Sequence, residues 1–257
     1  MVSIVAKHVS IDYPVFGKVA APKERKRTES VRRAELVRTK SRNVVRAIDD
    51  FSIEILQGDR LGIIGLNGSG KSTLLRMFGG IYRPSKGELR VEGRVSSMFN
   101  VGLGTRMEST GRRNIYLRGY MRGLTKSEVR SLEEEIIEFS GLGDFIDMPL
   151  RSYSSGMVLR LSFAIMTTFD PEILLMDEWI GVGDSQFQEK AANRLRSLVE
   201  RAGITVLCSH NVGIIKENCQ RVIWLDKGRV FCDGSPEEVL PEYIAWKNEI
   251  TDRVGVK

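Results

Sequence analysis

The sequence has no long hydrophobic run and nothing that resembles a secretory signal. Its most apolar stretches, such as residues 173–176, end within a few residues in charged side chains, whereas a membrane-spanning helix needs roughly 18 to 20 consecutive apolar residues. Residues 1–4 lead directly into strand-like sequence, without the charged and then apolar pattern of a secretory signal. We therefore expect a cytoplasmic chain that contains no transmembrane segment.

Cysteine is also scarce, with 3 residues in a chain of 257. Cys208, Cys219 and Cys232 have no Cys-x-x-Cys spacing and lie in or near apolar runs, where cysteine usually behaves as a small buried hydrophobic side chain. The pattern indicates neither a disulfide framework nor a zinc site. With 257 residues, of which 42% are hydrophobic, the chain can bury a full core and is long enough to be an enzyme.

Positive charge is unevenly distributed. The net charge is +6, and most of the excess lies in residues 23–46, inside an insertion that we place at residues 18–46. A solvated polar loop is the interpretation that we favour. Contact with anionic lipid headgroups is the second, because clustered Lys and Arg side chains are attracted to the cytoplasmic surface of a membrane. Nucleic acid is the third, since no aromatic residues for base stacking are interleaved with the charges.

Hydrophobic periodicity predicts an α/β protein with helices in mid-chain. Strands are expected at residues 3–12, 50–55, 60–64 and 89–98, with a turn at 57–59, and helices at 70–78, 110–121, 125–140 and 155–168. A short helix at residues 31–37 is a further expectation. Short apolar strands at 172–176, 205–208 and 221–225 then alternate with helices at 186–202 and 212–218. This alternation is typical of a buried parallel sheet, and an antiparallel sheet is expected before it.

A glycine-rich loop follows the strand that ends at residue 64 and opens the next helix. In this position it is a P-loop, whose backbone N–H groups surround phosphate oxygens at the positive end of the helix dipole. Lys71 is predicted to reach the β and γ phosphates of ATP, and the hydroxyl of Ser72 is predicted to bind Mg²⁺. The residues predicted to bind the nucleotide here are Gly65, Asn67, Gly68, Ser69, Gly70, Lys71, Ser72 and Thr73.

Two adjacent carboxylates end the buried strand at residues 172–176. In a P-loop protein the first, Asp177, is placed to hold Mg²⁺, and the second, Glu178, is placed to polarise the attacking water. The alternative is an ordinary strand end with two acidic residues, which the P-loop makes the less favoured interpretation. His210 follows the next strand, but a lone histidine is more often structural than catalytic. From its position alone, His210 would not be assigned to the site.

Residues 153–157, with the sequence Tyr-Ser-Ser-Gly-Met, resemble the signature loop of ABC ATPases. The common form of that loop is Leu-Ser-Gly-Gly-Gln, of which Ser154 and Gly156 are kept. The P-loop, Asp177-Glu178, Gly183-Asp184 in the D-loop position and His210 in the switch position occur in the order of this family. The resemblance therefore covers essentially the whole chain.

The family resemblance implies an α/β fold, namely a RecA-like P-loop NTPase core with an antiparallel β subdomain and a helical subdomain. All parts would belong to one ABC ATPase domain that spans residues 1–257. On this division, residues 1–95 and 165–257 form the core with the β subdomain. Residues 96–164 form the helical lobe, which includes the signature loop.

The variants of these motifs are similar to the branch of the family that exports bacterial polysaccharides, namely O-antigen, capsule and teichoic acid. The similarity lies in residues 153–164, in residues 177–184 and in residues 102–117. The last of these resembles the segment of that branch that faces the membrane subunit. Where most ABC proteins have a Q-loop glutamine, this chain has Asn100, which is a further candidate ligand of Mg²⁺.

The resemblance also implies roles that the patterns leave open. Tyr13 would stack on adenine, the alternative being a plain tyrosine at a strand end. Ser154, Ser155 and Gly156 would bind the γ phosphate that is held by a second copy of the chain, so that each site needs a homodimer. His210 would contact the γ phosphate. The implied catalytic residues are Glu178, His210 and Lys71.

An ATPase of this kind would work at the cytoplasmic face of the inner membrane with an integral membrane permease, through which it would move a lipid-linked glycan. No nucleic acid partner is expected. Some members add a carbohydrate-binding domain, but only residues 247–257 follow Trp246 here, so we expect none. Two alternatives remain. One is a transport ATPase for another cargo, and the other is a soluble ABC ATPase, which typically has two ATPase cores or a long coiled-coil insertion.

Overall fold

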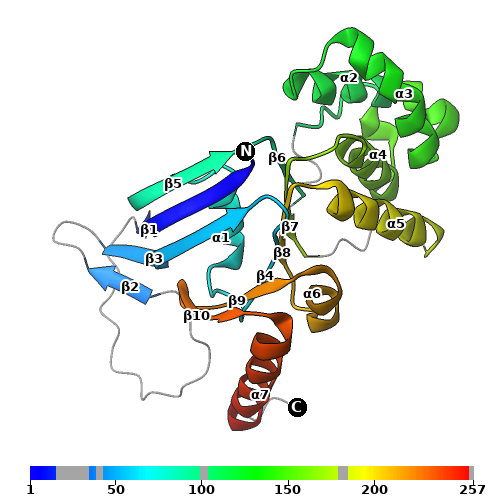
Figure 1. Cartoon of the computed structure of the whole chain (residues 1–257). Coiled ribbons are helices and arrows are strands. Elements are labelled where there is room, and N and C mark those ends of the chain that lie inside the picture. Colours follow the sequence, from blue (N-terminus) through cyan, green and yellow to red (C-terminus); the bar gives the residue numbers. More distant parts are fainter. Residues whose placement is uncertain (16–34, 39–42, 99–103, 179–184, 255–257) are drawn as a thin grey trace. The chain divides into compact units, whose positions relative to one another are not determined.

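The computed structural model describes residues 1–15, 35–38, 43–98, 104–178 and 185–254 (Figure 1). The chain divides into two compact units. The first comprises Met1–Ser97, Glu172–Trp179 and Gly203–Lys257, and the second comprises Met98–Pro171 and Ile180–Ala202. The second unit extends beyond the expected lobe of residues 96–164, because a later helix, α5 (Ser185–Arg201), packs against α4 (Ser155–Thr168).

A four-stranded antiparallel sheet lies in the first unit, as the sequence predicts. The strand order is β2 (Glu35–Arg38), β3 (Asn43–Leu56), β1 (Ser3–Pro14) and β5 (Lys86–Glu92), and these strands lie side by side in Figure 1. Ile4 and Ala6 are buried, whereas the residues that alternate with them are more exposed. One face of the sheet therefore belongs to the core.

The short helix expected at residues 31–37 is wrong for the described part of that segment. Residues Glu35–Arg38 form β2, in which Leu36 pairs with Val45 and Val37 pairs with Val44 of β3. A helix of this length is marginal by itself, whereas the edge of β3 offers the backbone hydrogen-bond partners. The insertion expected at residues 18–46 thus ends inside this sheet. Its residues 18–34 and 39–42 lie outside the described residues.

A six-stranded sheet forms the centre of the first unit. Its order is β10 (Arg229–Gly234), β9 (Arg221–Asp226), β4 (Arg60–Ile64), β8 (Ile204–Cys208), β7 (Ile173–Asp177) and β6 (Val95–Ser97). All neighbouring strands are parallel except β10 and β9. Strands β4, β7 and β8 are largely buried, as expected for parallel strands covered on both faces. The turn at residues 57–59 joins β3 to β4, but the two strands belong to different sheets.

Among its described residues, the first unit has three helices: α1 (Lys71–Phe78), α6 (Val212–Asn218) and α7 (Pro236–Val254). Helix α1 contacts β3, β7 and β8, so it lies between the two sheets and buries Leu74, Leu75 and Phe78. Helix α7 packs on β9 and β10, where the rings of Trp224 and Trp246 are 4.7 Å apart between centroids. The sequence patterns did not indicate α7 or β10.

The second unit is helical, with α2 (Gly111–Met121), α3 (Lys126–Ser140), α4 and α5, and short 3₁₀ turns at Gly143–Asp147 and Leu150–Ser152. A capping box starts α3: the hydroxyl of Thr125 accepts from the N–H of Glu128, whose carboxylate accepts from the N–H of Thr125. Within the described ranges, no helix combines the length and the hydrophobicity that crossing a membrane requires.

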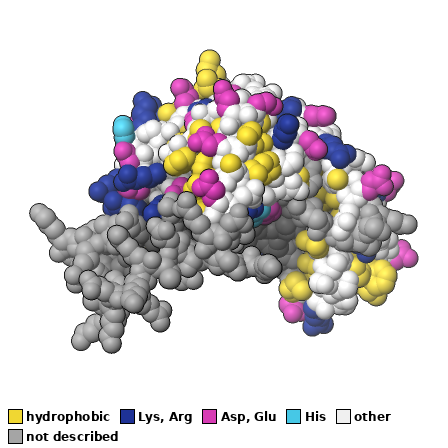
Figure 2. All heavy atoms as spheres, turned by 90° about the horizontal axis from the view of Figure 1, so that it is seen from below, with side chains coloured by type: hydrophobic (Ala, Val, Ile, Leu, Met, Phe, Trp, Pro, Cys, Tyr) yellow, Lys and Arg dark blue, Asp and Glu magenta, His cyan; other side chains and the backbone are white. Residues whose placement is uncertain are grey.

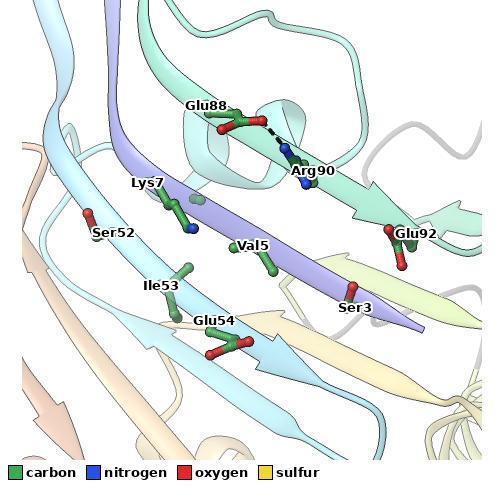
Figure 3. Close-up of a pocket in the computed structure, with 10 residues that line it drawn as sticks. Ser3, Val5, Lys7, Ser52, Ile53, Glu54, Glu88, Arg90 and Glu92 are labelled. Carbon is green, nitrogen blue, oxygen red and sulfur yellow. Dashed lines mark hydrogen bonds and ion pairs between the residues drawn. The ribbon is translucent and has the colours of Figure 1, made fainter. Parts of the chain in front are cut away.

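The described surface carries charges of both signs. On the face drawn in Figure 2, Lys and Arg side chains are interspersed with Asp and Glu side chains. The outer face of the antiparallel sheet is similarly mixed. In the close-up of Figure 3, Glu54, Lys7 and Arg90 come from three neighbouring strands, and Arg90 pairs with Glu88 at 2.8 Å. This face has a shallow hollow of about 580 Å³, and its lining contains none of the predicted site residues.

Candidate functional site

Most of the predicted site residues in the first unit line one cleft, which has a volume of about 510 Å³. Strands β1 and β3 supply one wall, the loop before α1 supplies the second, and the residues after β7 and β8 supply the third. The lining residues are Tyr13, Val45, Ala47, Asn67, Gly68, Gly70, Lys71, Ser72, Thr73, Asp177, Glu178 and His210. The structure thus brings together segments from both sheets of this unit.

The loop between β4 and α1 needs glycine where it turns and where it packs. Gly68 and Gly70 have φ angles of +82° and +110°, in the region that favours glycine. A Cβ atom on Gly70 would lie 2.6 Å from the carbonyl oxygen of Ala47, and one on Gly65 would lie 2.3 Å from that of Leu225. Glycine therefore allows the loop to approach β3 and β9 closely.

The side chain of Lys71, where this loop meets α1, fits an anionic ligand. Lys71 is 7% exposed, its Nζ donates to the carbonyl oxygens of Gly65 (2.8 Å) and Leu66 (3.1 Å), and burial lowers the pKa of Lys71. A phosphate oxygen in the cleft would give Lys71 an opposite charge. The Oγ of Ser69 is also buried and has no hydrogen-bond partner within the described residues, but Ser69 is not among the residues that line the cleft.

Glu178 is held in an unusual conformation beside the loop. Its φ angle is +71°, which is uncommon for a residue other than glycine. Its backbone N–H donates to the carbonyl oxygen of Cys208 at 2.8 Å. Its Oε2 accepts from the hydroxyl of Ser209 at 3.3 Å and from the backbone N–H of His210 at 3.5 Å, and its Oε1 lies 3.5 Å from Nε2 of His210.

Asp177 and Ser72 supply oxygen atoms to the same cleft, from the end of β7 and the first turn of α1. Carboxylate and hydroxyl oxygens are ligands that Mg²⁺ accepts, usually together with phosphate oxygens and water. The two residues therefore fit a magnesium ion that is shared with a bound phosphate. The third candidate ligand, Asn100, lies outside the described residues, as do Gly183 and Asp184 of the expected D-loop.

Tyr13 stands at the end of β1, where two neighbours hold its ring. Its hydroxyl donates to Oγ1 of Thr73 at 3.3 Å. The ring of Tyr82 meets it edge-on, with centroids 5.5 Å apart and an interplanar angle of 83°. Burial raises the pKa of Tyr13. Tyr13 lines the cleft, and the stacking of adenine on its ring stays a prediction.

Ser154, Ser155 and Gly156 lie in the second unit, at the start of α4. Ser154 caps this helix, because its Oγ accepts from the backbone N–H of Met157 at 3.2 Å. A hydroxyl that accepts one bond still has its proton to donate, and both serines are exposed. This helix N-terminus therefore suits a phosphate oxygen. That the three residues act on a nucleotide held by a second copy stays a prediction.

Ser209 is a site residue that the sequence patterns did not single out. It is buried, and besides donating to Glu178 its hydroxyl accepts from the backbone N–H of Asn211 at 3.1 Å. The available signal is its place between the end of β8 and His210. Val45 and Ala47, which line the cleft from β3, carry no motif that points to them.

Known proteins are similar to this chain along most of its length. The ABC transporter family model matches residues 48–181. The O-antigen export system ATP-binding protein RfbB of Klebsiella pneumoniae is 40% identical over 237 residues, which cover 92% of this chain and 95% of that protein. A protein of the same name from Myxococcus xanthus is 42% identical over 201 residues, which cover 78% of this chain. The chain spans only 46% of the length of that second relative.

The fold has solved counterparts. The structure of a dimeric bacterial ABC transporter cassette matches with a TM-score of 0.66 at 20% identity, and the match covers 91% of this chain and 98% of the cassette. The similarity in fold agrees with the family match and with the identity along nearly the whole Klebsiella relative. The chain therefore belongs to the ABC transporter family, of which it contains the ATP-binding domain.

Proposed function

We propose that this chain is the ATP-binding and ATP-hydrolysing subunit of an ABC transporter that exports a lipid-linked, O-antigen-like polysaccharide across the cytoplasmic membrane. The observation that carries the catalytic part is the cleft in which Lys71, Asp177 and Glu178 border the same space. The similarity to an O-antigen export protein along nearly its whole length supports the cargo.

In this proposal the phosphates of ATP occupy the loop between β4 and α1. Lys71 exchanges the carbonyl oxygens of Gly65 and Leu66 for oxygens of the β and γ phosphates. Stacking of adenine on Tyr13 contributes about 1–3 kcal/mol. Mg²⁺, when held by Ser72 and Asp177, stabilises the negative charge that develops on the phosphates.

Glu178 is the proposed general base. Hydrogen bonds from the hydroxyl of Ser209 and from the N–H of His210 fix its carboxylate at the edge of the cleft. A base must be fixed in this way to take a proton from the attacking water. His210, whose imidazole lies beside Glu178, contacts the γ phosphate.

A homodimer completes each site in this proposal. Ser154, Ser155 and Gly156 of one copy bind the γ phosphate held by the other, with the hydroxyl of Ser154 as donor and the N-terminus of α4 as the positive end of a dipole. The dimeric cassette with the same fold supports this arrangement. ATP then joins the two copies, and hydrolysis releases them.

An integral membrane permease is the proposed partner, so that the chain works as a peripheral protein at the cytoplasmic face. In the second unit, Met107, Phe145 and Met148 are exposed. Their segments lie together, because the N–H of Arg151 donates to the carbonyl oxygen of Met107 at 2.9 Å and that of Gly111 donates to Met148 at 3.3 Å. Grouped apolar side chains at a surface favour contact with another protein, and we place the permease here.

The test is to express the chain with its permease in cells that lack their own O-antigen exporter. Wild type should hydrolyse ATP in the purified complex and restore polysaccharide at the cell surface, whereas Lys71→Ala should do neither. Glu54→Gln, on the outer face of the antiparallel sheet, is the matched control and should behave as wild type. ATP hydrolysis without any surface polysaccharide would contradict the proposed cargo, and absence of hydrolysis would contradict the proposal as a whole.

A further inference from the structure

Arg46 joins two carboxylates next to the cleft. It lies on β3 opposite Asp12 of β1, and Asp12 directly precedes Tyr13. Its Nε and Nη2 donate to the two carboxylate oxygens of Asp12 at 2.8 and 3.1 Å, and its Nη1 donates to Asp49 at 3.3 Å. One guanidinium group therefore ties the end of β1 to a residue further along β3.

Backbone hydrogen bonds connect Asp49 to the phosphate-binding loop. The N–H of Asp49 donates to the carbonyl oxygen of Gly228 at 3.0 Å, and the N–H of Gly228 donates to the carbonyl oxygen of Ser69 at 2.8 Å. Arg229, the next residue, donates to the carboxylate of Asp49 at 2.8 Å. Gly228 has a φ of +78°, and a Cβ there would lie 2.4 Å from the carbonyl oxygen of Ala47. The backbone at Gly228 therefore packs directly against β3.

The central ion pairs are shielded from solvent. The side chains of Arg46, Asp12 and Asp49 are only 19%, 14% and 16% exposed, and a bidentate pair in such a setting is stronger and less screened than one at the surface. Hydrogen bonding to Asp12 raises the pKa of Arg46. The neighbours of Arg46 in sequence, Val45 and Ala47, both line the cleft.

We propose that Arg46 is a positioning residue for nucleotide binding, which fixes the separation between Tyr13 and the phosphate-binding loop by holding Asp12 and Asp49 together. The inference rests on the proposed ATP-binding function. A bound nucleotide spans both ends of the cleft, so a site whose two ends are already in place loses less conformational freedom on binding. A triphosphate without a base contacts only the loop and does not depend on this separation.

The test compares two ligands in the full-length chain, in the presence of Mg²⁺: ATPγS, which carries the base, and inorganic tripolyphosphate, which lacks it. Arg46→Met should weaken binding of ATPγS about tenfold, within the range of a lost base stack, and should leave binding of tripolyphosphate unchanged. In a Tyr13→Ala background, Arg46→Met should weaken the binding of ATPγS no further, because the ring on which the base stacks is already absent.

Further variants separate positioning from folding. Arg46→Lys keeps the charge but cannot form the bidentate fork, and Asp12→Asn removes one carboxylate charge with little change of shape. Both variants should weaken the binding of ATPγS and leave the binding of tripolyphosphate unchanged. Arg221→Met is the matched control, because it removes a bidentate pair with Asp233 (2.8 and 2.6 Å) between β9 and β10, and it should bind both ligands as wild type does. Thermal unfolding curves are measured first, and binding is then compared at a temperature at which every variant is folded.

Three outcomes would overturn the inference while leaving the proposed function intact. They are unchanged binding of ATPγS by Arg46→Met, equal weakening of both ligands by this variant, and an undiminished effect of this variant in the Tyr13→Ala background. A wild-type chain that binds neither ligand would instead overturn the proposed function, and this inference with it.

Discussion

The hydroxyl of Ser209 donates to the carboxylate of Glu178 across 3.3 Å, from the residue after β8 to the residue after β7. The two strands are parallel, and their register pairs Asp177 with Cys208. Glu178 and Ser209, the residues that follow this pair, therefore lie next to each other. The register of two buried strands thus determines where the proposed general base lies, and the loop that carries His210 adds a second donor.

Removing the hydroxyl of Ser209 should slow hydrolysis more than it weakens binding. We expect Ser209→Ala to lower kcat about tenfold, which corresponds to about 1.4 kcal/mol, with little change in KM, because Glu178 loses a donor but the nucleotide loses no contact. Steady-state ATP hydrolysis gives both constants. Ser140→Ala removes another buried serine hydroxyl, in the second unit, and should leave kcat unchanged. A wild-type kcat in Ser209→Ala would show that this bond does not position the base.

Two defective chains should restore each other if each site is shared. Homodimers of Lys71→Ala and of Ser154→Ala should both be inactive, since each lacks one half of both sites. In a mixed dimer, one site carries both substitutions and the other is intact. Equimolar mixing should therefore recover a substantial part of the wild-type rate of ATP hydrolysis. Mixtures that stay inactive would contradict a site shared between two chains.

The three thiols should react at very different rates. Burial raises the pKa of Cys219 to about 12 and that of Cys208 well above its ordinary value, whereas Cys232 is only partly buried. Since the thiolate is the reactive form, a chromogenic disulfide reagent should label Cys232 in the native chain and all three cysteines after denaturation. Cys232→Ser should abolish the labelling of the native chain. Rapid native labelling of Cys208 would contradict the burial of β8.

The cap of α3 should make stability depend on pH. Bonds from the backbone N–H and the hydroxyl of Thr125 hold the pKa of Glu128 below its ordinary value. The ionised carboxylate therefore contributes stability above its unfolded-state pKa, and this contribution is lost as pH falls through the folded-state pKa. Glu128→Gln removes the titration. The difference in free energy of unfolding between wild type and this variant, measured in urea, should narrow from neutral to acidic pH. A difference that does not change with pH would contradict the expectation.

The parts of the site that the sequence predicts are those that a local motif determines. Gly68, Gly70 and Lys71 owe their positions to one short loop between a strand and a helix. Asp177 and Glu178 end a recognisable buried strand. The structure places all five at one cleft, because parallel strands and the helices that follow them bring such segment ends to the same edge of the sheet.

The parts that the sequence does not predict depend on pairing between distant segments. Asp12 and Arg46 meet only through the register of β1 and β3, and this register shifts between Ile11 and Asp12. A shift of one residue changes which side chains lie opposite each other, so hydrophobic alternation alone cannot find the pair. The same holds for Leu36, whose strand β2 exists through its pairing with β3.

Whether Glu178 is the general base is best tested by ATP turnover of Glu178→Gln, measured beside wild type with ATP and Mg²⁺ and combined with a measurement of dimerisation. We expect the variant to bind ATP and to form an ATP-dependent dimer but not to turn ATP over, because glutamine keeps the shape of glutamate and cannot take the proton. Hydrolysis at the wild-type rate would show that Glu178 is not the general base, and His210 or another residue would then have to take that role.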